Sequence, residues 1–334
     1  MLRKAQWEGR AMTFDLEFER PLAKLDEQIQ SLSRKGERLT ADQRKQLAAL
    51  ERELTQQLDA LYANLTPWQR VQVSRHRQRP HTADYVKTVC EDFFELRGDR
   101  RFADDRAILA GLASLDGRTV MLIGHEKGRD TKERQECNFG CPHPEGYRKA
   151  LRLMRQAERL HLPVITLIDT QGAFPGLEDE ERGQAEAIAE NLFVMARLRT
   201  PIVCAVIGEG GSGGALAIGV GDRLLMMQNA YYTVAAPEAA AAILWRDATQ
   251  APEAAAAMKI GAPDLLELGL IDRIVTEPRG GAHRDWRAAS DLLCTALIEE
   301  IRALESLSVD DLLERRAAKL RAYGAFAREP AIPA

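Results

Sequence analysis

The residues best placed to do chemistry are glycines that follow an apolar run. Gly208–Gly214 contains five glycines, lies after Pro201–Ile207 and precedes Ala215–Ile218. This pattern predicts a buried strand, a glycine-rich turn and the start of a helix. Such a turn lets a ligand approach bare backbone, and the free amides of a helix start attract negative charge. The segment therefore predicts a site that holds a phosphate or stabilises an oxyanion.

This segment can be compared with two nucleotide-binding motifs. Gly208, Gly210 and Gly213 spell G-x-G-x-x-G, the dinucleotide-binding pattern. That motif requires an acidic residue at the end of the next strand, and the predicted strand Arg223–Met227 ends in Gln228–Asn229. A phosphate-binding P-loop would need a lysine before Ser or Thr, which this turn does not contain.

The same glycines also fit a serine hydrolase. Gly210–Gly214 spells G-x-S-x-G, in which Ser212 would be the nucleophile, and Asp272 and His283 follow in the required chain order. Tight packing of a strand against a helix is a further explanation. This segment alone leaves these alternatives open beside an oxyanion hole built from backbone amides.

A second turn of the same kind favours the oxyanion hole. Pro163–Ile168 predicts another buried strand, Asp169–Gly176 follows as a turn, and a helix is expected from about Glu180 to Arg197. Two strand–turn–helix units in succession predict that both turns lie on one edge of a sheet.

Helices and a hairpin are predicted around these units. Residues 14–61 have apolar stripes at helical spacing that Lys35-Gly36 interrupts, which predicts a helical hairpin. Thr66-Pro67 predicts a cap and a first-turn proline. Further predictions are a helix around 84–94, a β-hairpin of 108–115 and 119–125 about Asp116-Gly117, a helix over 144–160 and a helical tail over 290–327.

Composition narrows the class of protein. The 334 residues are 45% hydrophobic and 29% charged, and the net charge of −4 gives no strong bias toward nucleic acid. No apolar stretch approaches the length of a membrane span, and the first residues lack the apolar core of a signal peptide. Five scattered cysteines favour reduced thiols in the cytoplasm, and Cys137 and Cys141 lack the second pair of ligands of a metal site.

Several segments together resemble the carboxyltransferase alpha subunit of bacterial acetyl-CoA carboxylase. In chain order they are Gly124–Glu133, Asn138–Gly140, Pro142–Leu151, Asp169–Gly176, Glu181–Gln184, Gly208–Asp222, Ile243–Trp245, Ala256–Ile260, Leu268–Asp272 and Pro278–His283. They cover most of 65–285. Departures from the usual family pattern are Gln171 and Phe174 for Pro and Tyr, Ala239 for Gly, and Cys141 for Met.

The resemblance implies an α/β crotonase-like fold of repeated strand–strand–helix units, with the helical hairpin before it and the helical tail after it. It implies transfer of a carboxyl group from carboxybiotin, held by a biotin carboxyl carrier protein, to acetyl-CoA to give malonyl-CoA, the first committed step of fatty acid synthesis. The expected partners are a zinc-ribbon beta subunit in an alpha2-beta2 assembly, the carrier protein and biotin carboxylase. No metal is expected on this chain.

The resemblance also implies which residues form the site. The backbone amides of Gly210 and Gly211 would form the oxyanion hole on the biotin side, where preorganised donors meet developing charge. The cleft would be shaped by Gly172, Ala173, Phe174, Gly176, Gly213 and Gly214, and the candidate anion contacts are Lys127, Arg129 and Lys132. The expected divisions are 1–64 for the helical arm, 65–289 for the carboxyltransferase domain and 290–334 for the tail.

Overall fold

The computed structural model describes residues 14–324, and its centre is a mixed sheet in the order β1-β2-β3-β4-β5-β6-β8. The strands are β1 (Phe93–Glu95), β2 (Ile108–Leu115), β3 (Arg118–His125), β4 (Val164–Thr170), β5 (Ile202–Gly211), β6 (Arg223–Met227), β7 (Tyr231–Thr233) and β8 (Arg273–Val275). β1, β2 and β3 pair antiparallel, whereas β3, β4, β5, β6 and β8 run parallel. β7 lies off this path and pairs with the end of β5.

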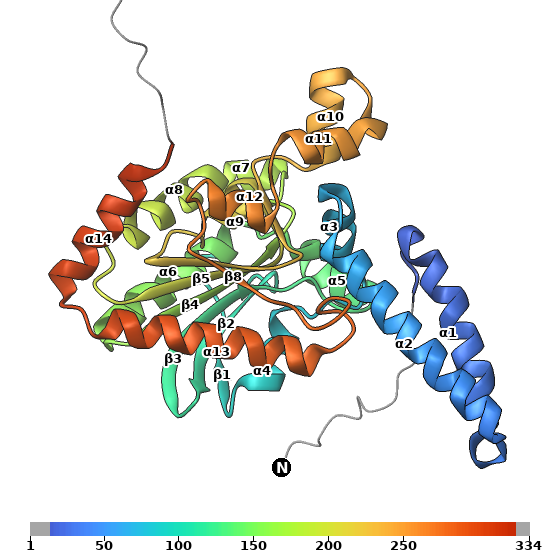
Figure 1. Ribbon diagram of the computed structural model, residues 1–334. Helices are drawn as coiled ribbons and strands as arrows, with labels where there is room; N and C mark the ends of the chain where they lie inside the picture. The colour runs from blue at the N-terminus through green and yellow to red at the C-terminus, as the bar shows by residue number, and fades with distance from the viewer. Residues whose placement is uncertain (1–13, 325–334) are drawn as a thin grey trace, which may run out of the picture.

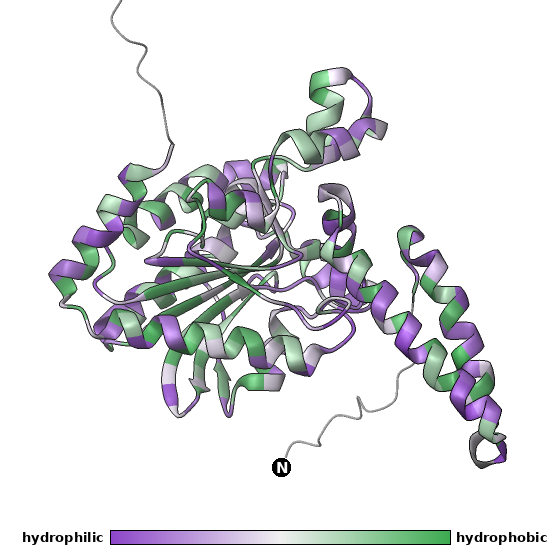
Figure 2. Ribbon diagram, in the orientation of Figure 1, coloured by the Kyte–Doolittle hydropathy of each residue, from purple (hydrophilic) through white to green (hydrophobic). Residues whose placement is uncertain are grey.

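The sheet is buried because helices cover both of its faces. α4 (Thr82–Val89) and α13 (Trp286–Glu305) pack on one face, and α6 (Pro144–Arg159) and α8 (Gln184–Met195) lie beyond the other (Figure 1). All residues of β4 and β5 are buried. Figure 2 shows these strands as the apolar centre of the molecule, as expected for a parallel sheet covered on both sides.

The predicted N-terminal helical hairpin is confirmed. α1 (Arg20–Ser33) and α2 (Ala41–Ala63) lie side by side and project from the body (Figure 1), with Leu22, Leu54 and Leu58 in a small core of their own. The hairpin is tied to the body through buried Glu19, which accepts a hydrogen bond from Tyr62 at 2.6 Å and pairs with Arg284.

The shorter helices fill the connections. They are α3 (Pro67–Ser74), α5 (Thr131–Glu136), α7 (Leu177–Glu181), α9 (Ser212–Leu216), α10 (Pro237–Trp245), α11 (Ala251–Ala257), α12 (Ala262–Glu267) and α14 (Val309–Ala322), with 3-10 turns η1 (Glu17–Glu19), η2 (Gly36–Arg38), η3 (Asn138–Gly140) and η4 (Ala248–Gln250). Thr66 caps α3 through the amide of Gln69, as its sequence predicts. Along 14–324, no helix combines the length and apolarity needed to cross a membrane.

The structure differs from the sequence-based expectation at three elements. The helix expected around 84–94 ends at Val89, and Phe93–Glu95 instead forms the edge strand β1 against β2. The helix expected from Glu180 is broken into α7 and α8 at Gly183, whose φ of 82° lies in the left-handed region. α13 begins at Trp286, ahead of the expected boundary at 289. The domain divisions remain predictions, and the last residues of the expected tail lie outside the described residues.

Candidate functional site

The two glycine turns meet at one edge of the sheet, as the sequence predicts. β4 and β5 run parallel, so the turns that follow them leave from the same edge. A β-carbon added at Gly211 would collide with the carbonyl of Gln171, and one at Gly214 would collide with the backbone of Gly172. Glycine is therefore required at both positions because two main chains approach closely, and not because of φ, which is −96° at Gly211.

The predicted turn over Gly208–Gly214 is shorter than expected. β5 continues through Gly211, because Thr170 pairs with Gly210 on one side and β7 pairs with Glu209–Gly211 on the other. The helix that follows, α9, has only five residues, so its dipole is small. Ser212 makes the change of direction with φ of 51°, and its side chain is exposed.

The residues predicted to shape the cleft lie in two segments, the turn between β4 and α7 and the beginning of α9. Gly172 faces open space, since a β-carbon placed there would meet no atom within 4 Å. The ring of Phe174 lies 4.6 Å from that of His143. Gln184 Nε2 donates to the carbonyls of Pro142 and Phe174, both at 3.0 Å, and so joins this turn to the neighbouring loop.

The other glycines predicted to shape the cleft differ in their surroundings. A β-carbon at Gly176 would collide with the carboxylate of Asp179, whereas one at Gly213 would make only ordinary contact with Ile188 at 3.7 Å. Ala173 packs beside Ile188 in a small apolar cluster behind the turn. Gly176 is thus fixed by packing, and Gly213 has room for a methyl group.

Buried charges lie directly behind the glycines. Lys127 Nζ bonds to Asp169 Oδ1 at 2.6 Å and to Glu209 Oε2 at 2.7 Å. Glu209 Oε1 accepts from Arg75 at 2.7 Å and from the hydroxyl of Tyr231 at 2.6 Å.

These contacts shift the ionisation of the group. The two carboxylates raise the pKa of Lys127 to about 12 against the opposing effect of burial, and Lys127 and Arg75 lower the pKa of Glu209 to about 2 although burial opposes this shift. Lys127 and Glu209 are therefore both charged around neutral pH.

The three predicted anion contacts have different surroundings. The charge of Lys127 is balanced by its two carboxylates. Arg129 pairs with Asp84 and lies 4.4 Å above the ring of Trp286, and burial lowers its pKa to about 10. Lys132 is exposed on the first turn of α5. A contact of any of them with a bound anion remains a prediction.

The hydrolase triad is not assembled. Asp272 accepts from the amide of Leu224 at 2.6 Å, at the beginning of β6, whereas Ser212 follows the end of the parallel strand β5. His283 is buried with its ring 4.1 Å from that of His76, beside the N-terminal hairpin. The dinucleotide motif fails as well, because Gly208 and Gly210 lie within β5 rather than in a loop.

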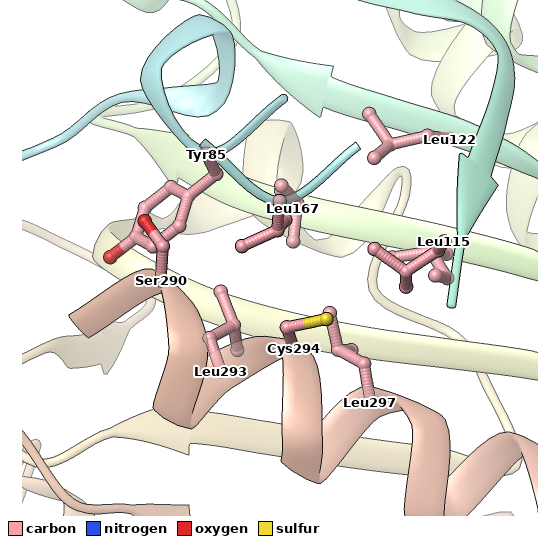
Figure 3. Close-up of a pocket in the computed structure, with 10 residues that line it drawn as sticks. Tyr85, Leu115, Leu122, Leu167, Ser290, Leu293, Cys294 and Leu297 are labelled. Atoms are coloured by element: carbon pink, nitrogen blue, oxygen red, sulfur yellow. The ribbon is translucent and has the colours of Figure 1, made fainter. Parts of the chain in front are cut away.

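An enclosed cavity beneath α13 is too small to be a substrate site. It has a volume of about 10 Å³, close to that of one water molecule. Its lining comes from α4, α13 and the sheet (Figure 3) and includes Tyr85, Leu115, Leu122, Leu167, Ser290, Leu293, Cys294 and Leu297. Within residues 14–324, no three His, Cys, Asp or Glu side chains gather in a way that could hold a metal ion.

Sequence reasoning missed the residues that surround the glycines from behind. Asp169 and Glu209 each lie at the end of a buried strand, a position that could have drawn attention to them. Arg75, Arg79 and Tyr231 come from distant parts of the chain, and nothing in their local sequence indicates that they meet β5.

The fold is one that carboxyltransferases share. A transcarboxylase 12S structure with methylmalonyl-coenzyme A matches with a TM-score of 0.54 at 17% identity, over 66% of this chain and 42% of that one. A Pseudomonas malonate decarboxylase hetero-tetramer in complex with coenzyme A matches with a TM-score of 0.53 at 20% identity, over 66% of this chain and 91% of that one. The crotonase-like fold expected from the sequence is thereby confirmed.

Sequence comparison narrows the class further. The model of the acetyl co-enzyme A carboxylase carboxyltransferase-like family matches residues 15–324. The acetyl-coenzyme A carboxylase carboxyl transferase subunit alpha of Azoarcus sp. (strain BH72) is 54% identical over 93% of this chain and 97% of its own length. The corresponding subunit of Methylococcus capsulatus is 54% identical over 95% of this chain and 98% of its own length. The chain belongs to the family of acetyl-CoA carboxylase carboxyltransferase alpha subunits, and neither the hydrolase nor the dinucleotide alternative gains support.

Proposed function

We propose that this chain is the alpha subunit of a carboxyltransferase that moves a carboxyl group from carboxybiotin to acetyl-CoA and so forms malonyl-CoA. The observation that carries the proposal is its similarity, over nearly its whole length, to carboxyl transferase alpha subunits. The geometry agrees with it, because two glycine turns meet at one sheet edge, as a site built from main-chain donors requires.

The amides of Gly210 and Gly211 are proposed to stabilise the negative charge that develops when the carboxyl group is released. Carboxybiotin supplies the carboxyl group, and its ureido oxygen is the atom that gains the charge. Preorganised amides suit this task because they need no reorganisation as the charge develops. Ser212 is not required as a nucleophile, since the proposed donors are the main-chain amides of Gly210 and Gly211 and no side-chain hydroxyl takes part.

The cleft residues are proposed to hold the ring beside these amides. The open side of Gly172 fits a bound ring, because the position offers space that any larger side chain would fill. Phe174 would form an apolar wall, held in place by His143 and Gln184. Exclusion of water from this cleft would strengthen every hydrogen bond to the developing charge.

A second chain is proposed to complete the site. The word alpha in the names of the relatives implies a complementary subunit, and we propose a zinc-ribbon beta subunit that binds acetyl-CoA, in an alpha2-beta2 assembly served by a carrier protein and biotin carboxylase. We propose the cytoplasm as its compartment, in agreement with the free thiols of all five cysteines.

The test is reconstitution. The chain, the beta subunit encoded in the same genome and the carboxylated carrier protein are combined, and malonyl-CoA is measured. We expect formation of malonyl-CoA only when both subunits are present, with each subunit alone as the control. Robust transfer by this chain alone would contradict the proposed partnership, and no transfer by the assembled complex would contradict the proposed function.

A further inference from the structure

A change of register in β5 lies immediately before the proposed oxyanion donors. Ile168 pairs with Val206, and the next pair joins Thr170 to Gly210, so β5 advances four residues while β4 advances two. The extra residues lie within Ile207–Glu209 and form a β-bulge. Bulges bend a strand and redirect the residues that follow. At this bulge β5 also exchanges one neighbour for another, because Val203–Val206 pairs with β6 and Glu209–Gly211 pairs with β7.

The bulge has main-chain groups that two buried charged side chains satisfy. Asp169 Oδ1 accepts from the amide of Glu209 at 2.9 Å, and Arg79 Nε donates to the carbonyl of Ile207 at 2.7 Å. Both side chains are almost fully buried. An unsatisfied main-chain group at such a depth is costly, so these two contacts favour the bulged backbone over an in-register strand.

Each of these side chains is itself held from elsewhere. Arg79 forms two bonds to Glu277, at 2.6 and 3.1 Å. Lys127 pairs with the carboxylates of both Asp169 and Glu209. It thus binds the two residues that also share the hydrogen bond between the Glu209 amide and Asp169. A β-carbon at Gly208 would collide with the Asp169 carboxylate. Glycine at this position therefore allows the carboxylate to reach the amide of Glu209.

We propose that Asp169, Arg79 and Lys127 are positioning residues that hold the bulge of β5 and thereby set the direction of the amides of Gly210 and Gly211. This inference rests on the proposed function of those amides. It assigns Lys127 a role in the geometry of the donors rather than in direct contact with an anionic substrate.

Two substitutions at Asp169 separate a positioning role from a general one. Asp169→Ala removes the acceptor of the Glu209 amide, whereas Asp169→Asn keeps an oxygen that can accept from both that amide and Lys127. In the assembled complex we expect Asp169→Ala to lower kcat by roughly ten- to a hundredfold with little change in KM for acetyl-CoA, because misplaced donors weaken transition-state binding. Asp169→Asn should retain most of the activity.

Hydrogen exchange supplies a readout that does not depend on activity. We expect faster exchange over 208–212 in Asp169→Ala than in the wild-type complex, and wild-type exchange there in Asp169→Asn. The matched control is Asp222→Ala, which removes a buried carboxylate from a main-chain amide at the other end of β5 and should leave kcat unchanged.

The outcomes distinguish this inference from the proposed function. Provided that the wild-type complex is active, either of two results would overturn the inference. One is a near-normal kcat in folded Asp169→Ala, and the other is an equal loss of kcat in the Ala and Asn variants. If Asp169→Ala does not fold, Gly208→Ala replaces it, because its methyl group displaces the carboxylate without changing any charge, and normal kcat would then overturn the inference. An inactive wild-type complex would contradict the proposed function instead, and the exchange comparison would still decide whether Asp169 holds the bulge.

Discussion

At each end of β5 a buried carboxylate accepts a hydrogen bond from a main-chain amide of the strand. At the beginning, Asp222 accepts from Ile202 at 2.8 Å and pairs with Arg316 of α14. At the end, Asp169 accepts from Glu209 at 2.9 Å and pairs with Lys127. The chemistry of the two contacts is the same, but their surroundings differ.

The beginning of β5 is regular and closed. Its pairs with β4 and β6 stay in register, and Arg316 also donates to the carbonyls of Met195, Leu198 and Thr200. The other end is bulged and leads into glycines beside exposed Gln171 and Ser212. At the beginning of β5 a buried carboxylate thus stabilises a regular, buried strand. At the end of β5 the other carboxylate stabilises irregular backbone that we propose faces a ligand.

The largest loss of stability is expected at the regular end. Arg316→Met leaves Asp222 buried without its partner and frees three carbonyls, so the free energy of unfolding should fall by about 3–5 kcal/mol. Urea unfolding measures this change, and the exposed neighbour Arg315→Met is the matched control. Transfer per folded complex should be unchanged, and a specific loss of kcat would show that the two ends are not functionally distinct.

An intermediate loss of folding stability is expected at low pH, because of buried histidines near the end of β5 that carries the proposed donors. Burial lowers the pKa of His125 to about 4 and also lowers that of His81, both beside the end of β3. The unfolded chain, with histidine pKa values near 6.5, then binds more protons than the folded chain between about pH 6.5 and 4. Stability should therefore fall as pH decreases through this range, by up to about 1.4 kcal/mol per pH unit for each such histidine.

His125→Gln should reduce this dependence, whereas His161→Gln, at an exposed position, should leave it unchanged. The measurement is the free energy of unfolding of each variant as a function of pH. Identical slopes for wild type and His125→Gln would contradict the assignment. Glu209 adds a loss of its own only below about pH 5, because its pKa of about 2 in the folded chain lies below the value of about 4.5 in the unfolded chain. The change between about pH 6.5 and 5 therefore reports the histidines.

The smallest effect is expected at Ser212. Ser212→Ala keeps the main-chain amide, so kcat should stay within about threefold of wild type if backbone donors carry the reaction. A nucleophilic serine would instead lose about 10⁴-fold or more on this change. A steady-state assay of the assembled complex distinguishes the two results, and a loss of the larger size would assign chemistry to the hydroxyl.

The elements that depend on local sequence could be predicted, and those that depend on distant pairing could not. The apolar runs of β4 and β6 and the Asp116-Gly117 hairpin turn carry their own signals, and all appear in the structure. The bulge of β5 depends on β7 and on Arg79, which lie far from it in sequence. Lys127 shows the same limit, because sequence reveals its charge but not the two carboxylates that balance it.

If the turns after β4 and β5 form the cleft for carboxyl transfer, Gly172→Val should block that cleft. The added side chain enters open space, so the thermal unfolding and assembly of the complex should remain those of wild type. In the cleft it would occupy the position of the bound ring, so kcat/KM for carboxybiotin should fall by about a hundredfold. A folded, assembled Gly172→Val complex that transfers the carboxyl group at the wild-type rate would show that these turns do not form the transfer cleft.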